Sequence, residues 1–533
     1  MGKLWGASPG EEEQHREREN GNSNGSRSHS RPRSVSPDAH GRRLGPADER
    51  TSLLPPHRHL NPDDPAVSPY NLLSVRSLRW ASIFLLIVAF VWWLVLLVST
   101  FITPPGLHTR GGGWFAFAYS TLATGILLVL LLFYSTPSKT ERIVLGLVFF
   151  FLFVDTIIIL AAYPIRHDEN WIGIVSVVWA LVISAWAIMC DRVVEYGKRE
   201  EEVRLTGRRE TRYTLSEWCS VFAGTVLLTI FLAISILFTI NLSIRARDAT
   251  LPAPGKLILV DDGRYHIHLN CVGDKNASHP TIFLEGGEES VEGRLESWVA
   301  ETLADGDIQR YCYWDRPGYA WSENAPSPLS AGMAVDALSE ALRKADETGP
   351  YILVSHGVGG IYSRVFASRH TAEVHGMLLI DTTPDTYLGR IGSPTRGFLL
   401  WVRGWIYPLG LDRFVSAILL QHSRADRVYG RDAWQNGGQI KAELQENLVA
   451  TTFTANELGA ANAIMPDDMR VVVVSSGKKV KRSKSWFNGQ KALGERGKLV
   501  AWDVVNGADH EVWKEQAGKD LLKRRLSQLV HRS

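Results

Sequence analysis

Several kinds of functional site are missing from this sequence of 533 residues. It contains 4 cysteines, too few for a disulfide framework or a cysteine-rich metal site. Neither a phosphate-binding P-loop nor a dinucleotide-binding glycine motif nor an EF-hand loop occurs, so we expect no cofactor and no metal. The formal net charge of +2 gives no reason to expect a nucleic acid as partner.

Apolar runs are also missing from residues 1–76, which are rich in Ser, Arg, Glu, Asn and Pro. Such a composition buries too little apolar surface to offset the entropy lost on ordering, so we expect a disordered tail. Glu49, Leu53 and Leu54 in this tail resemble the acidic dileucine sorting signal of endosomal and vacuolar membrane proteins. A pattern this short also arises by chance in a tail without a signal.

Residues 77–245 contain five apolar runs, each close to the roughly 20 residues that a helix needs to cross a membrane. The runs lie at about 80–103, 113–134, 142–163, 171–190 and 219–240. The stretch IFLLIVAFVWWLVLLV has no polar face, which argues against a helix half-exposed to water. Trp80, Trp114, Trp171 and Trp218 stand at run ends, where we expect the indole N–H groups to lie near water.

Positive charge differs between the loops that join these runs. The loop between the fourth and fifth runs carries 7 Lys and Arg residues, whereas Arg110 and Arg166 stand alone in theirs. Because positive loops stay in the cytosol, we expect an integral membrane protein with a cytosolic N-terminus and a lumenal or extracellular C-terminal domain. On that side Asn276 lies in a glycosylation sequon, whereas the sequon at Asn241 abuts the membrane.

Asp155 lies inside the third run, where an ionisable group is costly and often functional. The alternative is a hydrogen-bonded packing residue. We favour the packing role because no second charge inside the runs pairs with Asp155.

The pattern changes from residue 250 to 533, where short β-rich runs alternate with helical segments. This alternation is typical of a mainly parallel α/β sheet. KLILV and RYHIHLNCVG predict an opening hairpin, and TIFLEGG, RYCYWDRPG, YILVSHG, GMLLIDTTPD, RVVVVSSG and KLVAWDVVNGADH predict further strands.

Five landmarks in this order carry a resemblance: LEGG followed by Trp298, YWDRPGYAWSE, YILVSHGVGG, MLLIDTTPD and NGADHEVW. They resemble those of the α/β-hydrolase superfamily, and the full chain is similar to fungal multi-pass membrane proteins of unassigned activity. The resemblance implies a doubly wound sheet of about eight strands, with the insertion at about 386–469 as a helical cap.

In that superfamily a sharp turn from strand to helix presents a nucleophilic serine beside two backbone amides that stabilise an oxyanion. Here the nucleophile position is Gly357, and the resemblance implies Val358 and Gly287 as the amides and His510 as the base. For the acid it implies Asp381, with Asp385 as second choice. That Asp381 only caps a turn stays open.

Gly357 excludes an acyl-enzyme, because glycine has no oxygen with which to attack. Ser355 lies two positions earlier in the strand and Ser363 in the following helix, so neither is placed to substitute. His510 can still activate water directly. Glycine also relieves the strain of this turn by roughly 1 kcal/mol, which fits a degenerate enzyme.

Two stretches of the domain allow more than one interpretation. Three interpretations fit the stretch GFLLWVRGWIYPLGL in the cap: it lines a pocket for an acyl chain, it lies on the bilayer, or it packs within the cap. We favour packing within the cap. The basic run either meets anionic headgroups or forms a solvated loop. It consists of Lys478, Lys479, Lys481, Arg482 and Lys484.

Cys271 and Cys312 fall on the second and fourth expected strands, which are neighbours in the α/β-hydrolase fold. They form either a disulfide, as an oxidising lumen allows, or two buried thiols.

Together these observations favour a membrane protein with a degenerate or non-standard hydrolase domain that binds an apolar or lipid-like ligand. Two alternatives remain: an active carboxyl-ester or lipid hydrolase that uses His510, and a scaffold or transport-related protein that works through its helices. The bilayer is the expected partner, and a vacuolar, endosomal or other secretory membrane is the expected location.

Overall fold

The structure is a computed structural model, and it describes residues 69–207, 214–495 and 497–531. Residues 1–68 of the predicted tail, with the motif at Glu49, Leu53 and Leu54, therefore lie outside the described residues. Its predicted end at residue 76 was wrong, because a short 3-10 turn (Pro69–Asn71) and the start of the first apolar helix at Leu73 are already ordered.

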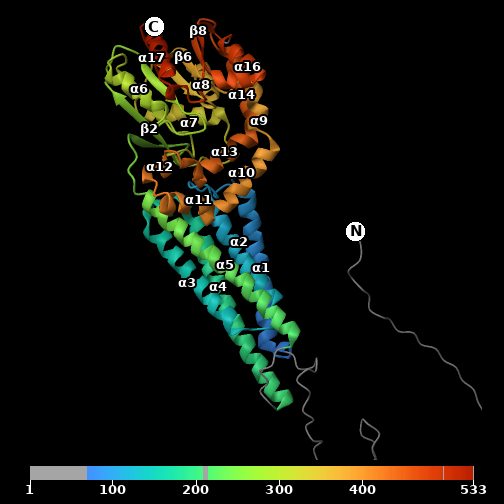
Figure 1. Ribbon diagram of the computed structural model, residues 1–533. Helices are drawn as coiled ribbons and strands as arrows, with labels where there is room; N and C mark the ends of the chain where they lie inside the picture. The colour runs from blue at the N-terminus through green and yellow to red at the C-terminus, as the bar shows by residue number, and fades with distance from the viewer. Residues whose placement is uncertain (1–68, 208–213, 496, 532–533) are drawn as a thin grey trace, which may run out of the picture. The chain divides into compact units, whose positions relative to one another are not determined.

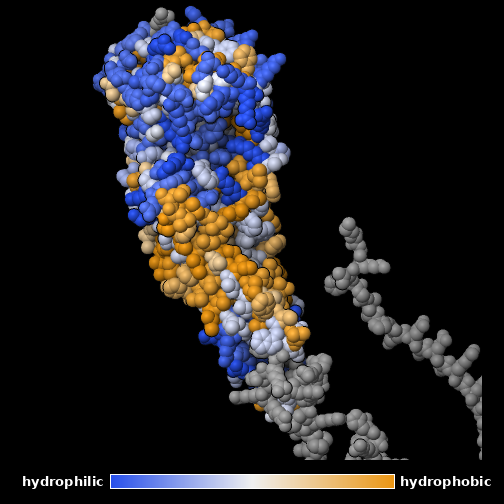
Figure 2. All heavy atoms as spheres, viewed as in Figure 1, coloured by the Kyte–Doolittle hydropathy of each residue, from blue (hydrophilic) through white to orange (hydrophobic). Residues whose placement is uncertain are grey.

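Each of the five apolar runs forms a helix that is long and apolar enough to cross a membrane (Figure 1). These are α1 (Leu73–Ser99), α2 (Trp114–Leu132), α3 (Lys139–Ala161), α4 (Tyr163–Thr206) and α5 (Leu215–Asp248). They share a core to which each contributes, for example Ala89, Phe115, Leu145, Ile183 and Leu242. Their outer surface is apolar as well (Figure 2), and only 17% of the most apolar window of α1 is buried inside the protein. Such a surface is suited to lipid rather than water.

Two details of the helices differ from the expectations. α4 and α5 extend past their apolar runs into charged sequence, where pairs such as Glu195 and Arg199 stand one turn apart and support the helix. Trp114 does not lie near water: its side chain is 1% exposed, and its indole N–H donates to the carbonyl oxygen of Gly437 at 3.1 Å. The cap covers this end of α2.

Asp155 is fully buried and accepts a hydrogen bond from the Tyr119 hydroxyl at 2.9 Å. This contact fits the packing role favoured from the sequence.

The C-terminal domain is built on one eight-stranded sheet of order β1-β2-β4-β3-β5-β6-β7-β8. The strands are β1 (Lys256–Val260), β2 (Tyr265–Gly273), β3 (Thr281–Glu285), β4 (Arg310–Trp314), β5 (Tyr351–His356), β6 (Val374–Ile380), β7 (Arg470–Ser476) and β8 (Lys498–Val505). β1 and β2 form the predicted hairpin, β2 pairs antiparallel with β4, and the remaining neighbours are parallel. The α/β-hydrolase fold expected from the sequence is confirmed.

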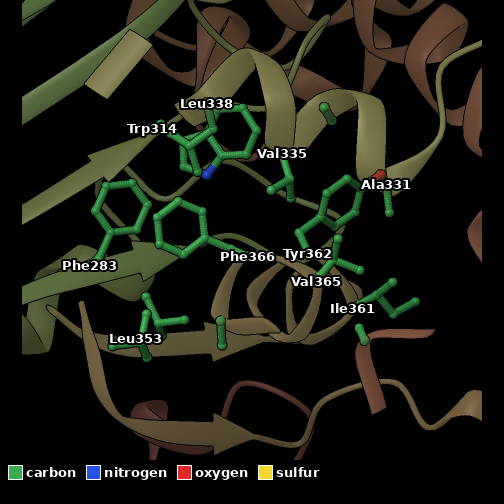
Figure 3. Close-up of a cluster of buried hydrophobic side chains, with 14 of the residues drawn as sticks. Phe283, Trp314, Ala331, Val335, Leu338, Leu353, Ile361, Tyr362, Val365 and Phe366 are labelled. Atoms are coloured by element: carbon green, nitrogen blue, oxygen red, sulfur yellow. The ribbon is translucent and has the colours of Figure 1, made fainter. Parts of the chain in front are cut away.

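Helices cover both faces of this sheet (Figure 1). One face carries α6 (Leu295–Ala304) and α17 (Gln516–Val530), and the other carries α7 (Ala331–Lys344) and α8 (Gly359–Arg369). Under α7 and α8 the rings of Phe283 and Phe366 stack with centroids 6.1 Å apart (Figure 3). Truncating a buried phenylalanine such as Phe366 to alanine costs roughly 3–5 kcal/mol, so this cluster carries much of the stability of the domain.

Short helices between β6 and β7 form the cap, in the place of the expected insertion. They are α9 (Leu388–Ile391), α10 (Pro394–Ile406), α11 (Leu411–Phe414), α12 (Arg424–Val428), α13 (Gly437–Val449) and α14 (Ala455–Ile464). Buried polar contacts join the cap to the apolar helices. Lys441 Nζ donates to the carbonyl oxygens of Ser99 and Thr100 at the end of α1, at 3.1 and 2.5 Å. Asn241 Nδ2 on α5 donates to the carbonyl oxygen of Tyr407 at 3.0 Å.

The stretch GFLLWVRGWIYPLGL forms most of α10, and its two sides differ. One side packs against Trp114 through Leu400, and Trp401 Nε1 donates to Thr100 Oγ1 at 3.2 Å. On the other side Phe398 and Leu399 are 63% and 60% exposed. The stretch therefore packs within the cap and also presents an apolar outer face.

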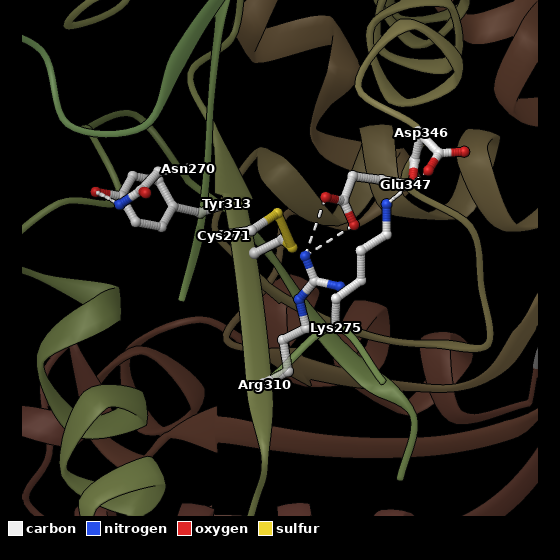
Figure 4. Close-up of a disulfide and its surroundings, with 8 residues drawn as sticks. Asn270, Cys271, Lys275, Arg310, Tyr313, Asp346 and Glu347 are labelled. Carbon is white, nitrogen blue, oxygen red and sulfur yellow. Dashed lines mark hydrogen bonds and ion pairs between the residues drawn. A yellow bond between two sulfur atoms is a disulfide. The ribbon is translucent and has the colours of Figure 1, made fainter. Parts of the chain in front are cut away.

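Cys271 and Cys312 lie opposite each other on β2 and β4 and form a disulfide (Figure 4). Of the two states that the sequence left open, the structure has the bridged one. The bridge joins two strands that are antiparallel neighbours but 41 residues apart in sequence.

The two glycosylation sequons differ in exposure. Asn276 is exposed in the turn between β2 and β3. Asn241 is 1% exposed and its amide is used in the contact to the cap, so it is closed to a glycan.

Candidate active site

The motif YILVSHGVGG folds as β5, a turn at Gly357 and the start of α8. Gly357 has a φ of 52°, a left-handed conformation that costs an ordinary side chain roughly 1 kcal/mol and costs glycine little. A Cβ on Gly359 would lie 2.4 Å from the carbonyl oxygen of Gly286. The start of α8 can therefore lie this close to the loop after β3 only if residue 359 is glycine.

Asp381 and His510, the residues implied as acid and base, lie side by side. Asp381 follows β6 and His510 follows β8, and Nδ1 of His510 lies 2.7 Å from Oδ2 of Asp381. The other oxygen of Asp381 accepts from the backbone N–H of Ser476 at 3.0 Å and from the indole of Trp486 at 2.8 Å. Burial favours the neutral acid, but these partners, His510 above all, outweigh burial and lower the pKa of Asp381. Its carboxylate is therefore a fixed anion.

A second carboxylate, which the motifs did not indicate, lies on the other side of the His510 ring. Oε2 of Glu288 is 3.5 Å from Nε2 of His510. A Cβ built on Gly357 would lie 2.6 Å from the same Glu288 oxygen and 3.3 Å from Nε2 of His510. The carboxylate of Glu288 therefore takes the space that a serine side chain at position 357 would need.

These two carboxylates set the charge of His510. Burial disfavours the cation, but hydrogen bonds with Asp381 and Glu288 outweigh it and raise the pKa of His510 to about 9. The side chain of Glu288 is 49% exposed, so burial opposes its charge only weakly, and the hydrogen bond and charge of His510 lower its pKa. At neutral pH the site holds an imidazolium between two carboxylates. Such a ring donates a proton and is unable to accept one.

His356 packs against this imidazolium, with ring centroids 4.1 Å apart. Burial and the charge of His510 lower the pKa of His356 to about 3. His356 is therefore neutral, and the positive charge of the pair resides on His510.

The residues implied as oxyanion donors border the same turn. Val358 follows Gly357 directly, and the Cα of Gly287 lies 3.3 Å from the position of a Cβ on Gly357. Buried Arg316 donates to the carbonyl oxygens of Gly286 and Gly287, the latter at 2.6 Å. Arg316 thereby fixes the loop that carries both Gly287 and Glu288.

A cleft of about 540 Å³ opens beside His510. Its eight lining residues are all ionisable: Glu288, Glu289, His356, Asp509, His510, Glu511, Lys514 and Glu515. Five of them are carboxylic acids. Carboxylates are therefore the most frequent charged groups at this cleft.

Other residues considered from the sequence lie elsewhere. Asp385 accepts from Arg364 at 2.5 Å and from Asn462 at 2.8 Å, away from His510. Ser355 and Ser363 are buried in β5 and α8.

The basic run is helical rather than a loop. It forms α15 (Gly477–Arg482) and the start of α16 (Lys484–Gly494). Nζ of Lys479 lies 3.6 Å from Oδ2 of Asp381 and 4.4 Å from the ring centre of Trp486. Lys479 is therefore a neighbour of the site, placed there by the turn of α15 after β7.

One signal for Glu288 was present in the sequence. In LEGGEES an acid follows the implied oxyanion residue Gly287 directly, so it had to lie at the mouth of the site. The contacts of Ser476 and Trp486 with Asp381 had no such signal. Ser476 uses its backbone N–H at the end of β7, and Trp486 reaches Asp381 only because α16 folds back toward β7.

The sheet, the turn at Gly357 and the Asp381–His510 pair define a protein of the α/β-hydrolase class. Residues 293–524 match the family described as "Alpha/beta hydrolase family", and residues 40–271 match a "Region of unknown function (DUF2417)". A solved carboxylesterase of Nitrososphaera gargenis is similar at 15% identity and a TM-score of 0.38, over 51% of this chain and 98% of that chain.

Two fungal relatives locate the chain within this class. An uncharacterized protein of Schizosaccharomyces pombe is 33% identical over 522 residues, which cover 91% of this chain and 97% of that protein. An uncharacterized vacuolar membrane protein of Saccharomyces cerevisiae is 28% identical over 386 residues, which cover 60% of this chain and 59% of that protein. The chain belongs to the same family of fungal α/β-hydrolase-fold proteins as the S. pombe protein.

Proposed function

We propose that this chain is a membrane-anchored α/β-hydrolase-fold protein that has lost serine acyl transfer and binds a ligand at the cleft beside His510. The observation that carries the proposal is the position of Glu288, whose carboxylate takes the space of a serine side chain at Gly357. Gly357 supplies no nucleophile, and Glu288 keeps His510 protonated, so nucleophile and base are both lost.

The charge of the cleft supports a ligand with a cationic group. Its five carboxylic acids outnumber the cationic groups even when Arg294, which pairs with Glu289 and Glu511, and Lys478, which pairs with Asp509, are counted. The remaining negative charge attracts cations. The apolar or lipid-like ligand expected from the sequence is, on this proposal, an amphiphile with an amine or quaternary ammonium head group. The head group would enter the acidic cleft.

A fluorophosphonate probe tests the loss of acyl chemistry on the full chain in detergent. We expect no labelled serine, because residue 357 has no hydroxyl. Labelling of any serine in the natively folded chain, absent after heat denaturation, would overturn the proposal.

A fluorescent alkyl trimethylammonium probe tests the ligand class. Binding should weaken in a Glu511→Gln/Glu515→Gln variant and with added salt, which screens the carboxylates. Glu301→Gln serves as the control, since Glu301 pairs with Lys519 on the surface outside the cleft lining. Equal affinities in all three proteins would reject a cationic ligand.

A water-using hydrolase is the second candidate, because Asp381 and His510 remain paired beside the Gly287 loop. In that reaction Glu288 would accept a proton from water and His510 would donate one to the leaving group. Ester turnover lost in both Glu288→Gln and His510→Ala supports it. Turnover that survives His510→Ala removes this mechanism.

We also propose a cytosolic N-terminus and a C-terminal domain in a vacuolar or other secretory lumen. The lysines and arginines of the loops support this orientation, as does the disulfide, which persists in oxidising compartments. The name of the S. cerevisiae relative supports a vacuolar membrane. Glycosidase digestion tests it: digestion should shift the mobility of the wild type and of Asn241→Gln but not of Asn276→Gln. A wild type that never shifts would count against a glycosylated lumenal domain.

A further inference from the structure

Three potential metal ligands from distant parts of the chain meet where the apolar helices adjoin the α/β domain. They are His167 near the start of α4, His266 on β2 and Glu323 in the loop after β4. Nδ1 of His167 lies 3.1 Å from Oε1 of Glu323, and Nδ1 of His266 lies 3.0 Å from Oε2. All three ligand atoms lie within 4.8 Å of one another.

These separations suit a small divalent ion. Zinc binds imidazole nitrogen and carboxylate oxygen at roughly 2.0–2.2 Å in a tetrahedron, which places neighbouring ligand atoms about 3.4 Å apart. Each histidine faces its own oxygen of Glu323, His167 at 3.1 Å from Oε1 and His266 at 3.0 Å from Oε2, and both separations are within a few tenths of an ångström of that edge.

The surroundings of Glu323 hold its carboxylate in place. Oε2 accepts from the backbone N–H of His266 at 2.7 Å and lies 3.3 Å from Nε of Arg110. Oε1 faces His167 and is left for an ion. Outer contacts of this kind orient metal-ligating carboxylates.

A cleft of about 510 Å³ gives access to the cluster, and His167, His266 and Glu323 all line it. Their side chains are 26%, 27% and 14% exposed, so solvent reaches them. Three protein ligands leave the fourth position of a tetrahedral ion open toward this cleft. Catalytic zinc sites with two histidines and one glutamate have this ligand count.

We propose that His167, His266 and Glu323 bind a zinc-type divalent ion whose fourth ligand is water or an anionic group from the cleft. The ion ties α4 to β2 and so links the helices to the α/β domain. The cysteine content and local spacing in the sequence did not indicate it, because His266 and Glu323 are 57 residues apart and His167 lies in another domain. The proposal is independent of the chemistry at His510.

Metal content and affinity provide the first test. The full chain, purified in detergent without a polyhistidine tag, should retain about one zinc per chain by elemental analysis. After chelation, Co²⁺ should restore the visible absorption of a tetrahedral site. His167→Ala and His266→Ala should weaken Zn²⁺ binding by more than the roughly 10- to 100-fold that loss of an outer-shell partner costs.

His375→Ala is the matched control, since His375 is an exposed histidine on β6 and should leave Zn²⁺ affinity unchanged. Thermal unfolding is a second readout: Zn²⁺ should raise the midpoint of the wild type and of the control but not of His266→Gln. A wild type that binds no Zn²⁺ would show an ion-pair cluster only, and the proposal would fail. Binding unchanged in both ligand variants would place the ion elsewhere and equally overturn it.

Discussion

Oε2 of Glu288 lies 3.5 Å from Nε2 of His510, on the opposite side of the ring from Asp381. In a serine hydrolase this nitrogen faces the nucleophile hydroxyl and takes its proton. Here it faces an anion, which favours the protonated ring. Gly357 supplies no nucleophile, and Glu288 disfavours the neutral histidine that would act as the base. Both features therefore oppose serine-hydrolase chemistry.

Restoring a serine at position 357 should give only weak activity by itself. Its Cβ would lie 2.6 Å from Oε2 of Glu288, so the glutamate must move, and His510 still needs a pH near 9 to become a base. We expect Gly357→Ser to hydrolyse p-nitrophenyl butyrate slowly, with kcat/KM rising up to alkaline pH. Gly357→Ser/Glu288→Ala should be faster and should reach its plateau at lower pH, because one carboxylate has gone.

Glu288→Ala alone is the control for that experiment and should remain inactive toward the ester. Identical pH profiles for the single and double serine variants would show that Glu288 does not set the charge of His510.

The charge of His510 also predicts how stability depends on pH. Its folded pKa of about 9 exceeds the ordinary value of about 6.5, so its contribution is complete below pH 6.5 and is lost as the pH rises through 9. The difference in thermal midpoint between wild type and His510→Gln should therefore shrink across that window. His375→Gln, which alters an exposed histidine, should show no such trend. A constant difference for His510→Gln would contradict the raised pKa.

Much of the fold was predictable because it is set by local pattern. The five apolar runs and the strand-turn-glycine landmarks specify their elements over a few residues each, as YILVSHG shows. The site was predictable only in part. Asp381 and His510 stand at strand ends, where topology alone brings them together. Glu288 reaches the His510 ring through the conformation of the loop after β3, and Lys479 reaches Asp381 through the short helix α15, and no periodicity encodes either contact. The position of Trp114 near water was predicted wrongly, because the residues that bury it belong to a helix more than 300 residues later in the chain.

The disulfide between Cys271 and Cys312 should be present in the native protein. Alkylation under denaturing conditions should modify two thiols, Cys190 and Cys219, before reduction and all 4 cysteines after it. Replacing both bridged cysteines by serine should lower the free energy of unfolding by roughly 2–4 kcal/mol, since the bridge closes a loop of moderate length. Four thiols reactive without reduction would refute the bridge.

The outer face of α10 should contact lipid. In a Cys219→Ser background, a bimane label at Phe398→Cys should be quenched strongly by brominated lipids in proteoliposomes, because this exposed apolar face continues the surface of the apolar helices. A label at Asp307→Cys, in the exposed loop between α6 and β4, is the reference. Equal quenching at the two positions would show that the cap stands clear of the bilayer.

Helix α13 joins the end of α1 to the loop beside His510. Near its start Gln439 donates to the backbone carbonyl of Glu288 at 3.1 Å, and two residues later Lys441 holds the last carbonyl groups of α1. One short helix therefore contacts both the end of α1 and the backbone that carries Glu288, so a substitution that displaces α13 is expected to disturb both places at once.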